Sequence, residues 1–154
     1  MSLPSAVLAR SASSLTGFAV AEGVGIDDGE TRLAGAVRQG LPMHVVDSVL
    51  ERHILTLAEI DRLAVPRKTL THRRTLGRLS AEQSDRLLRV LRVIRAAEVV
   101  FGDPGKAHRW LRRPTEALGG SPPLDLLDTD AGTRRVETLL GQIDHGIPPA
   151  LDAA

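Results

Sequence analysis

Residues 80–101 carry the pattern that most restricts the fold of this chain, because it fits one long amphipathic helix. Ser80 and Gln83 have the spacing of a capping box, in which each side chain accepts a hydrogen bond from the other residue's backbone amide. Apolar residues then recur at helical spacing, namely Leu87, Leu91, Ile94, Ala97 and Phe101. Gly102 is expected to end the helix. A helix of this length favours a helical fold around it.

The apolar residues in the rest of the chain favour the same fold class. Hydrophobic residues make up 42% of the chain but aromatic residues only 2%, with one Trp and no Tyr. Strands usually draw on aromatic and β-branched residues, whereas Leu, Ala and Arg, which dominate here, are strong helix formers. We therefore predict an all-α protein.

Signals for helix starts and stops divide the remaining chain into short helices. Glycine, proline and capping residues predict helices near residues 30–40, 42–53, 57–63, 66–76, 104–113 and 130–146. Asp103-Pro104 is a particularly clear start, an N-cap followed by proline at the first helical position. Residues 1–29, rich in Ser, Ala and Gly, are expected to form a mobile N-terminal arm. We expect one domain at 30–95, which includes the long connecting helix, and a second at 96–154 with a C-terminal tail.

Basic residues are concentrated in the middle of the chain. The net charge of the whole chain is +1, yet residues 62–95 contain 10 basic and 2 acidic residues. Such a block is typical of a nucleic-acid contact. A solvated, arginine-rich helix face explains it equally well, so charge alone leaves both interpretations open.

Residues 58–74 fit a helix, a tight turn and a second helix, the arrangement of a helix-turn-helix DNA-binding module. Leu63, Val65 and Leu70 are the expected buried contacts between the two helices. Side chains of the second helix would supply donors to phosphates and base edges, and the candidates are Arg67, Lys68, Thr69, Thr71, Arg73 and Arg74.

Two positions depart from the usual helix-turn-helix pattern. Ala64 stands where a glycine with positive φ is common, a conformation that costs an alanine about 1 kcal/mol unless the turn geometry is altered. Ile60 stands where a small residue normally lets the two helices approach closely. An ordinary pair of helices with a charged surface is the alternative to a DNA-binding module.

An ordered set of motifs in the second half of the chain resembles a known family. The motifs are Val99-Val-Phe-Gly-Asp103, Ala107-His-Arg-Trp-Leu111, Leu118-Gly-Gly120, Pro122-Pro-Leu-Asp-Leu-Leu127 and Ile143-Asp-His-Gly146. Together they resemble the antitoxins of RES–Xre toxin–antitoxin pairs, also called the Xre/MbcA/ParS-like group. The resemblance covers about residues 31–147 and is strongest from Ala96 onward.

The resemblance implies a two-part antitoxin with no enzymatic activity and no cofactor. Its first half would be an Xre-like helix-turn-helix domain that binds the promoter of its own operon, usually as a homodimer. Its second half would bind a cognate RES-domain toxin, which acts on NAD by hydrolysis or by ADP-ribosyl transfer. The antitoxin would then work by occupying and closing the active-site cleft of the toxin.

Candidate toxin contacts gather around the single tryptophan, in a leucine-rich step and at the chain end. They are Trp110, Arg112, Arg113, Leu124, Leu127, Asp144, His145 and Ile147. A tryptophan flanked by arginines is a common composition of interface hot spots, although a core position for Trp110 fits the sequence as well. The end of the chain, residues 144–154, is a candidate plug for the toxin's cleft, with a free tail as the alternative.

The sequence offers little support for enzymatic or membrane functions. The chain has no cysteine, which excludes disulfides and zinc fingers, and its five histidines fall in no metal-ligand pattern such as H-E-x-x-H. No apolar run approaches the roughly 18 residues of a membrane span. We expect a cytoplasmic, non-enzymatic protein. The competing interpretation is a helix-turn-helix transcriptional regulator with a C-terminal dimerisation or ligand domain and no toxin partner.

Overall fold

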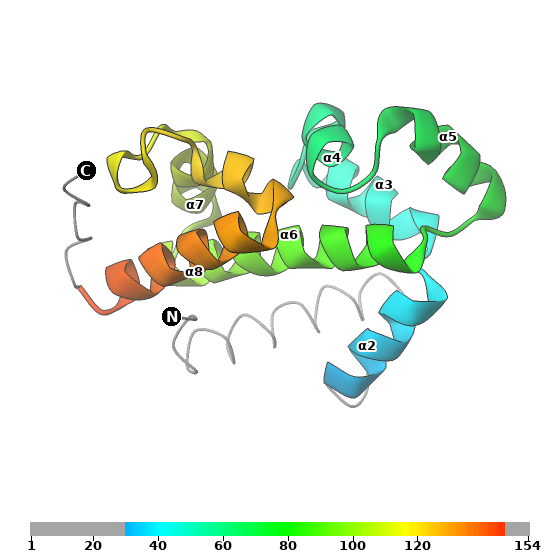
Figure 1. Cartoon of the computed structure of the whole chain (residues 1–154), viewed down its shortest axis with the longest axis horizontal. Coiled ribbons are helices and arrows are strands. Elements are labelled where there is room, and N and C mark those ends of the chain that lie inside the picture. The colour runs from blue at the N-terminus through cyan, green and yellow to red at the C-terminus, as the bar shows by residue number, and fades with distance from the viewer. Residues whose placement is uncertain (1–29, 147–154) are drawn as a thin grey trace. The chain divides into compact units, whose positions relative to one another are not determined.

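The computed structural model of the chain describes residues 30–146, which fold into helices joined by short loops (Figure 1). In chain order the elements are α2 (Glu30–Gln39), α3 (Met43–Glu51), α4 (Leu57–Leu63), α5 (Arg67–Leu76), α6 (Ala81–Phe101), α7 (Pro104–Arg112), the 3-10 helices η1 (Glu116–Leu118) and η2 (Pro123–Asp128), and α8 (Asp130–Asp144). Within this range the β-type pairing is limited to an isolated bridge between Pro42 and Arg78. The predicted all-α fold is confirmed. The expected N-terminal arm and the chain end from Ile147 lie outside the described residues.

The described residues form two compact units, 30–90 and 91–146, whose boundary lies inside α6. The first unit contains α2 to α5 and the beginning of α6. The second contains the remainder of α6, then α7, η1, η2 and α8. None of the helices in the described part of the chain has the length and apolar character needed to cross a membrane.

Capping residues and a glycine mark the start of α6, the start of α7 and the end of α5 at the positions that the sequence predicts. The Ser80 amide donates to Gln83 Oε1 at 2.9 Å, and the Gln83 amide donates to Ser80 Oγ at 3.1 Å, which completes the capping box. The Asp103 carboxylate accepts from the Lys106 amide at 2.9 Å and caps α7. Gly77 ends α5 in the left-handed conformation with φ 76°. These three predictions are confirmed.

Helix α3 is shorter than predicted. The sequence pattern extends it to His53, but the helix ends at Glu51, and His53 has a positive φ of 55°. The chain reverses there because Ile54 and Leu55 turn back into the core, where both side chains are buried. Their burial outweighs the continuation of the helix.

A buried serine anchors the first unit around its apolar core. Ser84 on α6 is 0% exposed; its hydroxyl accepts from the Leu41 amide at 2.8 Å and donates to the Ser80 carbonyl at 2.7 Å. The loop that follows α2 is thereby tied to the start of α6. The core around it consists of aliphatic side chains, among them Val45, Val46, Val49, Ile60, Val65 and Leu87.

The second unit packs α8 on η1 and η2, and η2 in turn on α7. Helix α8 begins very close to η2, because Gly132 has no side chain; a Cβ at that position would lie 2.0 Å from the Leu126 carbonyl oxygen. An ion pair adds a polar contact, since Arg92 Nη2 on α6 lies 2.9 Å from Oε1 of Glu137 on α8. Glu137 is only 7% exposed, so this pair fixes α8 against the second half of α6.

Candidate functional site

Helices α4 and α5 form the predicted helix-turn-helix arrangement in the first unit. Leu63, Val65 and Leu70 are all buried, which confirms the predicted contacts that set the two helices. Because these side chains point into the core, the opposite face of α5 is left to polar and charged residues.

The turn between α4 and α5 differs from the expectation for Ala64. Its backbone has φ −132° and ψ −57°, outside the left-handed region, so the expected strain of about 1 kcal/mol does not arise. The Ile60 carbonyl accepts from both the Ala64 and Val65 amides at 2.9 Å. Ile60 itself is 0% exposed and contributes its side chain to the core. The strain predicted for Ala64 is therefore absent, because this turn does not use the positive φ of the usual module.

We expect the substitution Ala64→Gly to lower the free energy of unfolding by about 0.5–1 kcal/mol, because glycine adds freedom to the unfolded chain and no positive φ exists to relieve. Urea denaturation measures the change. The matched position is Gly77, with φ 76°, where glycine to alanine should cost about 1 kcal/mol. A stabilised Ala64→Gly variant would contradict the turn geometry described above.

The predicted DNA contacts on α5 differ in exposure and in their partners. Arg67, Lys68, Thr71 and Arg74 are exposed, and Thr69 and Arg73 are half-buried. Arg74 forms an ion pair, with Nη1 2.7 Å from Asp47 Oδ1 on α3. Within residues 30–146, no acidic side chain forms an ion pair with Arg67, Lys68 or Arg73. These three charges are the ones most available to an anionic ligand.

Arginines on α6 belong to the same basic block but are largely neutralised by neighbours. Arg86 pairs with Glu82, and Arg95 Nη1 lies 2.5 Å from Glu98 Oε2. Together with the pair between Arg92 and Glu137, these contacts use much of the positive charge of α6 within the protein. Helix α5 is therefore the part of the block that best fits a DNA contact.

Sequence reasoning missed two caps that position α4 and α5. Thr56 and Glu59 form a capping box at the start of α4, a spacing that is visible in the sequence. Asp61 Oδ1 accepts from the Arg67 amide at 2.5 Å and closes the start of α5, although no local pattern predicts that contact. A carboxylate of the protein therefore accepts from the first backbone amide of this helix, which an anionic ligand would otherwise contact.

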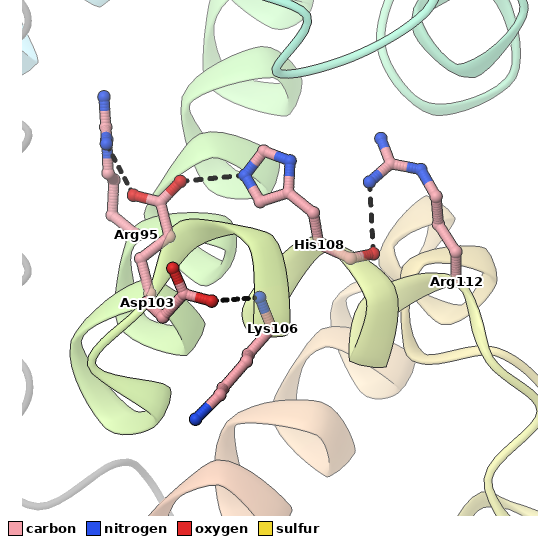
Figure 2. A network of polar contacts seen from close by, with 6 residues as sticks. Arg95, Asp103, Lys106, His108 and Arg112 are labelled. Carbon is pink, nitrogen blue, oxygen red and sulfur yellow. Dashed lines mark hydrogen bonds and ion pairs between the residues drawn. The ribbon is translucent and has the colours of Figure 1, made fainter.

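In the second unit, α7 carries the single tryptophan and a polar network that fixes the helix. The Trp110 side chain is half-buried, and its ring centroid lies 5.3 Å from that of Phe101. Figure 2 shows the network: Oε1 of the Glu98 carboxylate lies 2.8 Å from His108 Nε2, and its other oxygen contacts Arg95. Helix α7 is thereby held against the end of α6.

A cavity of about 360 Å³ opens at α7 and is lined by His108, Arg109, Arg112 and Arg113. We call it the α7 pocket. Arg112 is half-buried and donates through Nη1 to the His108 carbonyl at 3.2 Å (Figure 2), whereas Arg113 is exposed. The structure therefore brings two of the candidate toxin contacts, Arg112 and Arg113, together with two residues that sequence reasoning did not select.

The remaining candidate toxin contacts do not form one surface. Leu124 and Leu127 are 2% and 0% exposed, so the expectation that they face a partner was wrong; their side chains fill the core of the second unit. Asp144 and His145 are exposed at the end of α8, where His145 Nδ1 lies 2.9 Å from the Gly141 carbonyl oxygen. Ile147 lies outside the described residues. Across residues 30–146, no group of three or more His, Asp or Glu side chains has an arrangement that could hold a metal ion.

Comparison with known proteins places both units in one family. The model for the Antitoxin Xre-like helix-turn-helix domain matches residues 32–92, and that for the Antitoxin Xre/MbcA/ParS C-terminal toxin-binding domain matches residues 96–146. A protein named Antitoxin Xre from Yersinia enterocolitica is 38% identical over 120 residues, which cover 76% of this chain and 81% of that protein. The chain belongs to the Xre family of antitoxins.

Two further relatives of this Xre-family chain cover less of its length. Antitoxin Xre from Pseudomonas putida is 42% identical over 97 residues, 62% of this chain and 60% of that protein. A Sphingobium protein named Prs ADP-ribosylating antitoxin is 36% identical over 77 residues, 44% of this chain and 48% of that protein. The face of α5 that carries Arg67, Lys68 and Arg73, here called the α5 surface, belongs to the matched helix-turn-helix domain, and the α7 pocket belongs to the matched toxin-binding domain.

Proposed function

We propose that this chain is an antitoxin that neutralises a cognate RES-domain toxin acting on NAD. The observation that carries the proposal is the correspondence between the compact unit 91–146 and the matched toxin-binding domain, 96–146. The name of the Sphingobium relative, Prs ADP-ribosylating antitoxin, supports ADP-ribosyl transfer as the chemistry of the toxin.

The antitoxin acts by occupancy and not by catalysis. It covers the toxin and closes the cleft in which NAD binds, so the toxin keeps its catalytic groups but loses access to substrate. Within the second unit, the exposed side chains Asp144 and His145 at the end of α8 are candidates for this contact. Both proteins meet in the cytoplasm, where NAD is consumed.

The same chain represses its own promoter through α5, as a homodimer within a larger complex with the toxin. Support comes from the Xre-like helix-turn-helix match over residues 32–92 and from the available charges of Arg67, Lys68 and Arg73. Major-groove binding by the second helix of such a module places these side chains beside phosphates and base edges. A transcriptional regulator without a toxin partner is the second candidate function, because it would use the same α5 surface.

Co-expression with the toxin encoded in the neighbouring reading frame tests the proposal. We expect this chain to restore growth and cellular NAD content to the levels of cells without the toxin, and to co-purify with the toxin. The variant Arg67→Gln/Lys68→Gln is the control, since it should neutralise the toxin as well as the unchanged chain does. Persistent growth arrest with abundant soluble chain would leave the plain transcriptional regulator as the better description.

A further inference from the structure

Helix α7 concentrates positive charge without an acidic residue of its own. Residues Pro104–Arg112 contain Lys106, Arg109 and Arg112 but no Asp or Glu, and Arg113 follows directly. The three arginines and His108 line the α7 pocket. A cationic helix face that also forms a cavity is suited to an anionic group that enters it.

Two carboxylates beside α7, those of Glu98 and Asp103, take part in contacts within the second unit. The Glu98 carboxylate contacts Arg95 and His108, and the Asp103 carboxylate accepts from the Lys106 amide (Figure 2). Arg109 and Arg113 are exposed, and neither forms an ion pair with an acidic side chain in the described part of the chain. No direct ion pair with a described acidic side chain therefore occupies either guanidinium group.

The lining of the pocket indicates what kind of anion fits. The walls are mainly hydrocarbon, supplied by the side chains of His108 and the arginines, and the guanidinium groups provide the charge. A carboxylate at the end of a methylene stem matches this arrangement, because the stem contacts the apolar wall while the oxygens reach the planar guanidinium groups. A DNA phosphate has no such apolar stem.

We propose that the α7 pocket binds an acidic segment of the toxin, whose Asp or Glu carboxylates pair with Arg109 and Arg113. This inference rests on the proposed function, because it assigns a place on the matched toxin-binding domain to one part of the partner. Arg112, tethered to the His108 carbonyl, forms the wall of the pocket and holds the acidic side chain between its neighbours. Pairing of this kind selects the cognate toxin and speeds its association.

Charge reversal measures the contribution of the pocket to toxin binding. We expect Arg109→Glu/Arg113→Glu to raise the Kd for the purified neighbouring toxin at least 100-fold, with an unchanged circular dichroism spectrum. The matched control is Arg134→Glu/Arg135→Glu on α8, which changes the charge of the same unit by the same amount at two exposed positions. The control should change the Kd less than threefold.

The outcomes separate this inference from the function on which it rests. If the unchanged chain does not bind the toxin, both proposals fall. If the unchanged chain binds but the α7 variant binds equally well, or if both variants lose affinity equally, only the assignment of the pocket falls. If Arg109→Glu/Arg113→Glu loses promoter binding but retains toxin binding, the ligand of the α7 pocket is DNA, and the proposal that it binds an acidic segment of the toxin is contradicted.

A zero-length cross-link identifies the segment itself. The chain has two lysines, Lys68 on α5 and Lys106 on α7, so carbodiimide coupling of lysine amines to partner carboxylates can form at few places. We expect the complex to yield an amide between Lys106 and an Asp or Glu of the toxin, which mass spectrometry locates. The product should disappear in Lys106→Arg and persist in Lys68→Arg. A cross-link that survives Lys106→Arg unchanged would contradict the placement.

Discussion

Replacing Gly132 with alanine is expected to lower the free energy of unfolding of residues 91–146 by at least about 3 kcal/mol. The new Cβ would lie 2.0 Å from the Leu126 carbonyl oxygen and 2.9 Å from the carbon of the same group. A backbone carbonyl cannot swing aside as a side chain can, so the start of α8 has to move away from η2. That movement opens the core around Leu127 and Val136, both fully buried. Thermal and urea denaturation followed by circular dichroism measure the loss.

Gly105→Ala is the matched control for the Gly132 substitution. It makes the same chemical change in the same unit, but its nearest contact would be Asp103 Oδ2 at an ordinary 3.4 Å, and Gly105 lies in a helix. We expect its stability to stay within about 1 kcal/mol of the unchanged chain, on the stabilising side. Equal stabilities for the two variants would show that α8 and η2 do not approach as closely as described.

Removing the available charges of α5 is expected to weaken promoter binding about 100-fold near physiological salt. The variant Arg67→Gln/Lys68→Gln/Arg73→Gln deletes three positive charges while it keeps polar, unbranched side chains at these positions. Each lost phosphate contact should also reduce the slope of log K against log salt by about 0.9, so the total change approaches 3. Gel shifts or fluorescence anisotropy at several salt concentrations measure both quantities.

Arg86→Gln provides the control for the α5 variant. Arg86 belongs to the same basic block, but it already pairs with Glu82, so its removal should change promoter affinity less than threefold. An α5 variant whose salt slope equals that of the unchanged chain would show that other residues contact the phosphates. The antitoxin role would be unaffected by that result, since it depends on the second unit.

The sequence predicted features that depend on residues close together in the chain. The capping box of Ser80 and Gln83, the cap at Asp103 and the end of α5 at Gly77 all involve contacts within a few residues. Helical periodicity likewise identified the fold class, because it is a local repeat. The order of the family motifs pointed to the toxin-binding domain, since their spacing is itself a property of the sequence, whereas the helix-turn-helix half was predicted from its basic block and its helix–turn–helix pattern.

Features that depend on packing between distant segments were missed or predicted wrongly. The burial of Leu127 depends on how η2 lies beneath α8, and a leucine pattern in a six-residue element does not reveal which side is covered. The backbone of Ala64 follows from the path of the whole turn, so residue preference at that position gave the wrong φ. The ion pair between Arg92 and Glu137 joins residues 45 positions apart, so no local sequence pattern predicts it.

Trp110, whose ring is tilted by 44° against that of Phe101, serves as an intrinsic fluorescence probe of the second unit. Because Trp110 is the only tryptophan and the chain has no tyrosine, intrinsic fluorescence excited at the indole band originates entirely in the second unit. Far-ultraviolet circular dichroism, in contrast, sums over all helices. Comparing the two signals during unfolding therefore distinguishes a chain that melts as one cooperative whole from one whose halves melt separately, and no label has to be attached.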